Sequence, residues 1–330
     1  MTISNVIASA WSALRSEGHA KAGTYERRIF ATSPFRIYAA MERPSALQQL
    51  RFEFNLPGEN LPQIELKGVV LKGDVLPSGA LRVRLELGAI QFEEIFTTLA
   101  ADVVAKVLEA SSEQTALNRL VTRLEHWQRF LQSTEGKGLS LERQAGLFGE
   151  LTLLRTLLTA DRRHEDIMRS WQGPHGDNQD FARIGHAIEV KAATGNSLDT
   201  VTIANEHQLD DTGLTSLWLC HFCFDARKDA GVTLPTLVAE ISSLLSNELM
   251  VLFSDLLLQA GYVDEQRRIY SNRGYIERRR SYFAVMGDFP RIVATILPAG
   301  VARVSYQINT SGCADFRRTE ASVLKNFMAP

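Results

Sequence analysis

Apolar and polar residues alternate through much of the first third of the chain. Residues 4–16 carry apolar positions at helical spacing, whereas residues 25–87 alternate in segments such as RVRLELG, with Pro and Gly between them. Alternation with a period of two predicts strands that are buried on one face. Residues 91–109 and 115–133 return to helical spacing. We therefore predict a β-rich N-terminal domain over residues 1–132 that also contains helices.

A Gly-rich polar segment, STEGKGLS at residues 133–140, separates this region from the rest of the chain. We place a domain boundary there and predict a second domain over 133–330. Ser140 is a suitable N-cap for a helix that runs to about residue 160. A hairpin over 178–194, strands at 200–204 and 214–224, and helices at about 234–245 and 247–260 follow. Strand-like segments at 282–286, 291–296 and 302–309 complete an α/β pattern.

Composition sets limits on the class of protein. The chain has 330 residues, 45% of them hydrophobic and 22% charged, with a formal net charge of -2. A nucleic-acid partner would therefore need a local basic patch. Three cysteines suit a reducing compartment, and the most apolar run, residues 249–261, is too short to span a bilayer. The N-terminus lacks the pattern of a signal peptide, so we expect a cytoplasmic protein with no membrane contact.

The predicted hairpin carries two acids and a lysine. Glu189 and Lys191 are two residues apart in a strand, so their side chains share one face, while the alternate residues are apolar and face the core. Gly185 supplies the turn. An antiparallel partner strand then brings Asp180 close to Glu189.

Two carboxylates at this separation repel each other, and a shared proton or a bound cation relieves the repulsion. Mg²⁺ prefers carboxylate oxygen and water and needs only one or two carboxylates from a protein. Lys191 could lower the cost of deprotonating a metal-bound water or stabilise charge developing on a phosphate. These parts suit phosphodiester hydrolysis. The alternative is an ion pair between Glu189 and Lys191 on an exposed strand face.

A further acid lies on the helix that precedes the hairpin. Glu150 belongs to the apolar stripe of that helix, and Gly146 and Gly149 thin the helix beside it. A carboxylate that points toward the core needs a partner. If the helix packs on the hairpin, Glu150 could bind the same cation directly or through water; otherwise it is a solvated or salt-bridged helix acid.

An acid on a helix, then Asp, then Glu-x-Lys on a strand resembles the PD-(D/E)XK nuclease superfamily, also called restriction-endonuclease-like. The segments GLFGELTLL, WQGPHGDNQDF, IEVKA and HQL resemble the bacterial group known only as PD-(D/E)XK motif proteins. The resemblance implies an αβββαβ core, here with an additional β-rich α+β N-terminal domain. TVTIA would be its third strand, entering a helix at Gln208, and residues 214–224 the next strand.

The same resemblance implies a metal-dependent deoxyribonuclease. It assigns Asp180, Glu189 and Glu150 to the metal, Mg²⁺ or Mn²⁺, with Lys191 and Gln208 as further catalytic residues. It also implies DNA as substrate, a role in restriction or phage defence with partner proteins, and a homodimer. The acid is preceded here by NQ instead of the proline of the motif, which leaves Asp177 as a rival ligand.

An arginine-rich segment at residues 267–283 interleaves Arg with Tyr, a combination that suits phosphate contact and base stacking. The alternative for this segment is a salt-bridged face. Two other functions stay open: a DNA-binding accessory subunit that does not cleave, and a structural protein with no metal site. Our candidate DNA-contacting residues are Arg267, Arg268, Arg273, Arg278, Arg279 and Arg280.

Overall fold

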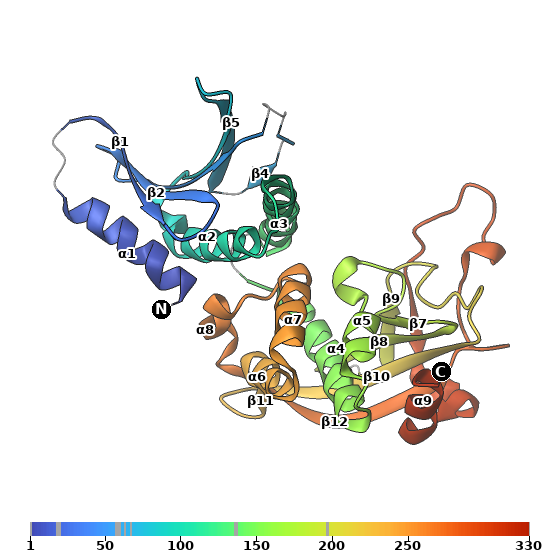
Figure 1. Ribbon diagram of the computed structural model, residues 1–330. Helices are drawn as coiled ribbons and strands as arrows, with labels where there is room; N and C mark the ends of the chain where they lie inside the picture. Colours follow the sequence, from blue (N-terminus) through green and yellow to red (C-terminus); the bar gives the residue numbers. More distant parts are fainter. Residues whose placement is uncertain are drawn as a thin grey trace. The chain divides into compact units, whose positions relative to one another are not determined.

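The computed structural model describes residues 2–17, 21–56, 61–62, 64–66, 68–134, 138–195 and 198–329. The chain divides into two compact units, Met1–Lys137 and Gly138–Pro330. Both units combine helices with β-sheets, so the fold is mixed α/β (Figure 1).

The N-terminal unit contains an antiparallel six-stranded sheet in the order β1-β2-β3-β6-β5-β4. Helices α1, α2 and α3 lie on one side of it (Figure 1). Trp11 of α1 stacks on Phe96 of α2, and its Nε1 donates to the carbonyl of Gln49, so two helices and the sheet share one core. The bounds are α1 Ile3–Ser16, β1 Gly23–Ile29, β2 Arg36–Arg43, β3 Gln48–Phe54, β4 Glu65–Leu66, β5 Val69–Val75, β6 Leu81–Leu87, η1 Ile90–Phe92, α2 Glu93–Leu108 and α3 Glu113–Thr134.

The C-terminal unit is built on a mixed sheet in the order β11-β12-β10-β8-β7, with β14 beside β12. β8 and β10 are parallel, whereas β7 and β12 are antiparallel to their neighbours. Its strands are β7 Phe181–Arg183, β8 His186–Thr194, β9 Thr200–Ile203, β10 Ser216–Lys228, β11 Val232–Thr233, β12 Arg273–Ala284, β13 Tyr306–Asn309 and β14 Arg317–Arg318.

Helices pack on one face of this sheet. Helix α4 begins after Ser140, whose Oγ accepts from the backbone N–H of Arg143, as the sequence predicts. It contacts β8 and α6. The helices are α4 Leu141–Ala160, α5 His164–Ser170, η2 Gly173–His175, α6 Leu234–Leu244, α7 Asn247–Ala260, η3 Asp264–Gln266, α8 Arg267–Tyr270, η4 Ala294–Ile296, η5 Thr310–Phe316 and α9 Glu320–Phe327.

β9 and β13 cover part of the opposite face as a separate two-stranded sheet. Ile203 and Ile308 from this pair form a core with Ala187 of β8 and Leu219 of β10. β8 is therefore buried on both faces, which explains how a strand can enclose charged side chains.

Three predictions about this unit are wrong. β9 does not join the main sheet, because it pairs with β13 instead. Gln208 lies in a turn, not at the start of a helix, and residues 204–215 contain no helix. The segment 291–296 forms no strand and ends in a short 3-10 helix. The αβββαβ order is thus not reproduced element for element, since the helix between the third strand and β10 is missing.

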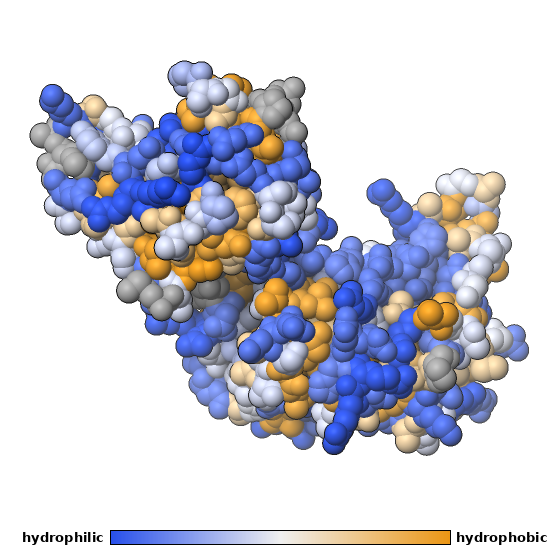
Figure 2. Space-filling view, in the orientation of Figure 1, coloured by the Kyte–Doolittle hydropathy of each residue, from blue (hydrophilic) through white to orange (hydrophobic). Residues whose placement is uncertain are grey.

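Apolar side chains reach the surface of this unit along α7 (Figure 2), where Met250 and Val251 are 41% and 44% exposed. Among the described residues, no helix is both long enough and apolar enough to cross a membrane.

Candidate functional site

The hairpin β7–β8 sets the position of the first acid. Gly185 forms the turn with a φ of +75°, a region that favours glycine, as the sequence predicts. The register pairs Phe181 with Ile188, and one further step places Asp180 opposite Glu189. Asp180 Oδ2 accepts a hydrogen bond of 2.7 Å from the backbone N–H of Val190. The end of the hairpin therefore fixes this carboxylate against the strand that carries Glu189.

Glu189 and Lys191 project from the same face of β8 and pair with each other. Glu189 is 1% exposed, and its Oε1 lies 2.9 Å from Nζ of Lys191, whose side chain is 17% exposed. The exposed-face alternative is therefore excluded for this pair. Lys191 Nζ also donates to Oε1 of Gln208 at 3.0 Å, and the same oxygen accepts from the N–H of Ala204 at 2.7 Å. Gln208 reaches the lysine from a turn, without the predicted helix.

Helix α4 crosses the other face of β8. A Cβ added at Gly149 would lie 3.1 Å from Cβ of Ala192 and 3.4 Å from Cγ1 of Val190, so this glycine permits the close approach that the sequence suggested. Val190 and Ala192 point away from the face that bears Glu189, because strand side chains alternate. Glu150 is the next residue of this helix.

Glu150 and Asp180 converge beside Gly173. A Cβ at Gly173 would lie 2.5 Å from Oε2 of Glu150 and 3.0 Å from Oδ1 of Asp180. The backbone N–H groups of Gln172 and Gly173 both donate to the carbonyl of Asp180, and Trp171 Nε1 donates to Oε2 of Glu150 at 2.8 Å. Sequence reasoning missed Trp171 and Gly173, although both belong to the WQGPHGDNQD phrase that pointed to the family.

Burial raises the pKa of all three carboxyl groups. It raises the pKa of Asp180 to about 6, even though the Val190 N–H and Lys191 oppose the shift. Burial, and next the charge of Asp180, raise the pKa of Glu150 to about 8. The same two causes hold the pKa of Glu189 well above its usual range, against the ion pair with Lys191. The surroundings of these three carboxyl groups therefore do not fully stabilise their ionised forms.

The donor set fits a hard divalent cation. Both carboxylate oxygens of Glu189 are buried, and neither accepts a hydrogen bond of good geometry from a described residue. Mg²⁺ and Mn²⁺ bind such oxygens, and Mg²⁺ needs only one or two of them from the protein. No three His, Cys, Asp or Glu side chains within the described ranges lie close enough together to hold one ion. Asp180 lies opposite Glu189 in the strand register and meets Glu150 beside Gly173, and the assignment of these three residues to a metal stays a prediction. Asp177, the rival ligand, is exposed.

The six arginines of the predicted DNA-contact segment lie on α8 and β12. Arg280 pairs with Glu277 at 2.8 Å and Glu320 at 2.7 Å and is 19% exposed at its side chain. The salt-bridged alternative thus describes Arg280. Others are also engaged: Arg278 pairs with Asp225, Arg279 with Asp199 and Arg267 with Asp264, whereas Arg273 lies over the ring of Tyr275. Arg268 is exposed on α8. DNA contact by this set stays a prediction.

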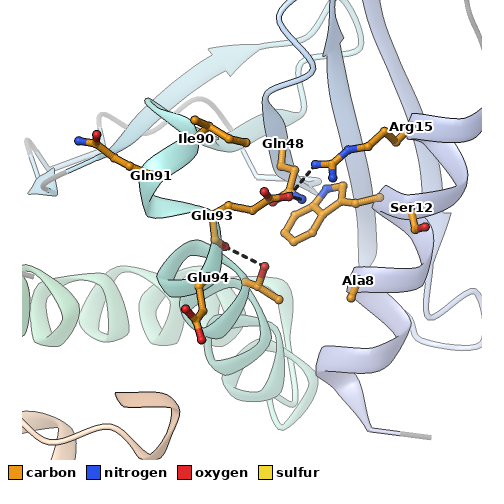
Figure 3. Close-up of a pocket in the computed structure, with 10 residues that line it drawn as sticks. Ala8, Ser12, Arg15, Gln48, Ile90, Gln91, Glu93 and Glu94 are labelled. Atoms are coloured by element: carbon orange, nitrogen blue, oxygen red, sulfur yellow. Dashed lines mark hydrogen bonds and ion pairs between the residues drawn. The ribbon is translucent and has the colours of Figure 1, made fainter. Parts of the chain in front are cut away.

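A separate cavity of about 510 Å³ opens in the N-terminal unit (Figure 3). Glu93 projects into it and is held by Arg15 at 2.6 Å and by Nε2 of Gln48 at 2.7 Å. The glutamine oxygen Oε1 is buried and has no hydrogen-bond partner among the described residues. Glu93 and Glu94 both line the cavity, but Glu93 is already paired with Arg15 and Gln48, so the candidate site stays in the C-terminal unit, where a lysine lies beside a buried glutamate.

A mixed α/β fold with a half-buried Asp opposite a Glu-x-Lys strand is typical of nuclease-like proteins. The chain belongs to the family described as "Putative PD-(D/E)XK family member, (DUF4420)", whose model matches residues 7–311. The match includes most of the N-terminal unit as well as the candidate site. No curated protein and no solved structure matches the chain. Family membership supports a nuclease-like function and, as is usual for such nucleases, use of a divalent metal.

Proposed function

We propose that this protein is a Mg²⁺- or Mn²⁺-dependent DNA endonuclease that hydrolyses phosphodiester bonds. The observation that carries the proposal is the buried Glu189, paired with Lys191 and opposed in register by the half-buried Asp180. Burying two acids with raised pKa values costs stability, which a bound cation would recover. A role in restriction or phage defence, with partner proteins and a homodimer, is supported by the family resemblance alone.

In this mechanism Asp180 and Glu189 would hold the metal, and Glu150 would assist from its position beside Asp180. The bound cation would polarise the phosphate and lower the pKa of the attacking water. Lys191 is a positioned ammonium with three N–H donors. One donates to Oε1 of Gln208, and the ammonium also forms an ion pair with Oε1 of Glu189, so an N–H remains for the water or a phosphate oxygen. Its positive charge then stabilises the negative charge that develops on the phosphate.

Gln208 orients the lysine and does not touch the reacting atoms. Its Oε1 is itself anchored by the N–H of Ala204, so it fixes the ammonium at one place on the face of β8. Positioning of this kind matters because a small displacement of a catalytic group reduces the rate strongly.

Cleavage of supercoiled plasmid with Mg²⁺ tests the proposal. We expect the wild type to nick or linearise the plasmid and Lys191→Ala to lose this activity. Lys228→Ala, which removes an exposed lysine at the end of β10, is the matched control and should cleave normally. In parallel, Mg²⁺ should raise the melting temperature of the wild type but not of Glu189→Gln. A wild type that neither cleaves DNA nor is stabilised by either metal would refute the proposal.

The second candidate is a DNA-binding accessory subunit that does not cleave. It is favoured by the lack of a third close ligand among the described residues. This function predicts DNA binding that is the same with and without Mg²⁺, and intact plasmid throughout. A structural protein without a metal site predicts neither Mg²⁺ stabilisation nor DNA binding.

A further inference from the structure

A groove of about 620 Å³ lies in the C-terminal unit at the outer side of β12. One wall is β12 between residues 277 and 282, and the other is formed by residues 317–320, which are β14 and the start of α9. β12 and α9 are neighbours in the fold (Figure 1). Four arginines and two glutamates line the groove, whereas the whole chain has a formal net charge of -2.

The acids near the groove are already paired. Glu277 and Glu320 both bind Arg280, which also lies 4.9 Å from the centre of the Phe222 ring. Arg279 pairs with Asp199. The carboxylates near the groove are therefore already neutralised by ion pairs. The same ion pairs hold the guanidinium groups of Arg279 and Arg280 in fixed positions.

Arg317 and Arg318 have no carboxylate partner among the described residues. Arg318 Nη1 donates only to the carbonyls of Asp315 at 3.2 Å and Arg317 at 2.8 Å. The guanidinium of Arg317 lies 5.9 Å from the centre of the Phe283 ring. A guanidinium has five N–H donors, so most donors of both side chains are available. Two adjacent cations without counter-charge in one groove fit an anionic ligand with more than one charge.

The unpaired outer edge of β12 limits which class of ligand the groove can bind. β11 pairs with β12 up to Tyr275, and β14 pairs from Tyr282 onward. Between them, residues 276–281 have no strand partner on the outer side within the described part of the chain. Arginines along an edge disfavour the addition of a protein strand. Guanidinium groups together with backbone N–H groups are the usual contacts of phosphate oxygens.

We propose that this groove binds the phosphate backbone of DNA, with Arg317 and Arg318 as its main contacts. The inference rests on the proposed nuclease function for its choice of DNA. Ser281 lines the groove and pairs in register with His221, which pairs with Lys191. The β12 wall of the groove is therefore two strand spacings, about 10 Å, from Lys191, and β14 with Arg317 and Arg318 lies one spacing beyond it. One DNA molecule can contact both places.

Fluorescence anisotropy with a labelled DNA duplex in EDTA tests the groove without cleavage. The variant is Arg317→Ala/Arg318→Ala. The control, Arg169→Ala/Arg227→Ala, removes two exposed, carboxylate-paired arginines and changes the net charge equally. We expect the groove variant to bind at least ~10-fold more weakly at low salt. Between about 50 and about 200 mM salt, its log–log slope should decrease by about 2, at about 0.9 per lost phosphate contact.

A third variant, Arg317→Lys/Arg318→Lys, keeps the charges and should restore most of the affinity if folding is intact. Equal affinity and slope in the groove and control variants would overturn the proposal, as would tighter binding of RNA than of DNA of the same sequence. If the groove variant loses affinity while the wild type neither cleaves plasmid nor is stabilised by Mg²⁺ or Mn²⁺, the nuclease is refuted and the groove stands.

Discussion

The raised pKa of Glu150 makes a quantitative prediction about stability and pH. Its pKa is about 8 in the folded protein against an ordinary 4.5. Below about pH 4 such a carboxyl group is protonated in both the folded and the unfolded state and costs no stability. The cost in free energy of unfolding then grows as the pH rises from about 4.5 to about 8. Linkage gives a cost of about 4 kcal/mol at pH 8 and about 1 kcal/mol at pH 5.

Glu150→Gln should therefore stabilise the metal-free protein, and do so more at alkaline pH. The amide oxygen of glutamine can still accept from Trp171, so the packing beside Gly173 is kept. The substitution also removes the repulsion between Glu150 and the Asp180 carboxylate, which is the second cause of the raised pKa of Glu150. We expect a gain of roughly 2–4 kcal/mol at pH 8 and less than about 1 kcal/mol at pH 5.

Denaturant unfolding in EDTA at the two pH values measures this difference. Glu142→Gln, an exposed acid in the first turn of the same helix, is the control and should change stability by under about 1 kcal/mol at both pH values. Equal effects of Glu150→Gln at pH 5 and pH 8, or a loss of stability at pH 8, would show that the carboxylate is not enclosed as described. Addition of Mg²⁺ at pH 8 should reduce the advantage of the variant.

Three further predictions concern the surroundings of the site. Gly173→Ala places a methyl group against both carboxylates, and should lower the free energy of unfolding by about 1–3 kcal/mol and remove the stabilisation by Mg²⁺. The control is Gly146→Ala, which has open space around it and should be neutral or stabilising in the same thermal melts. Trp171→Phe removes the donor to Glu150 and should cost roughly 1–3 kcal/mol in denaturant unfolding; an unchanged midpoint would contradict that hydrogen bond. Gln208→Ala should reduce the rate of plasmid cleavage ~10-fold or more, and rescue by Gln208→Asn would argue against a distance-specific contact.

Local patterns were enough to predict the hairpin and the helix before it. Ser140 caps α4, Gly185 forms the turn, and the two-residue spacing places Glu189 and Lys191 on one face, since each feature depends on neighbours in sequence. The position of Asp180 followed from hairpin register. Both the proposed metal site and the family resemblance were predicted from these residues.

Contacts between distant residues could not be predicted in the same way. β9 pairs with a strand about a hundred residues later, so its short apolar run gave no sign that it leaves the main sheet. Trp171 and Gly173 matter because of what the fold brings beside them. Asp199 and Glu320, which pair with Arg279 and Arg280, lie far away in the sequence, and an arginine-rich run alone does not reveal them.

The hydrogen bond from the main chain of Val190 to Asp180 has a consequence for how this protein can vary. A main-chain donor survives every side-chain replacement at its position except proline, so mutation at residue 190 can alter packing against α4 without releasing the acid. The contact depends instead on strand register and on the length of the segment before β7. We therefore expect insertions or deletions between Gly176 and Phe181 to release Asp180 from this donor, which substitutions at residue 190 other than proline would not do.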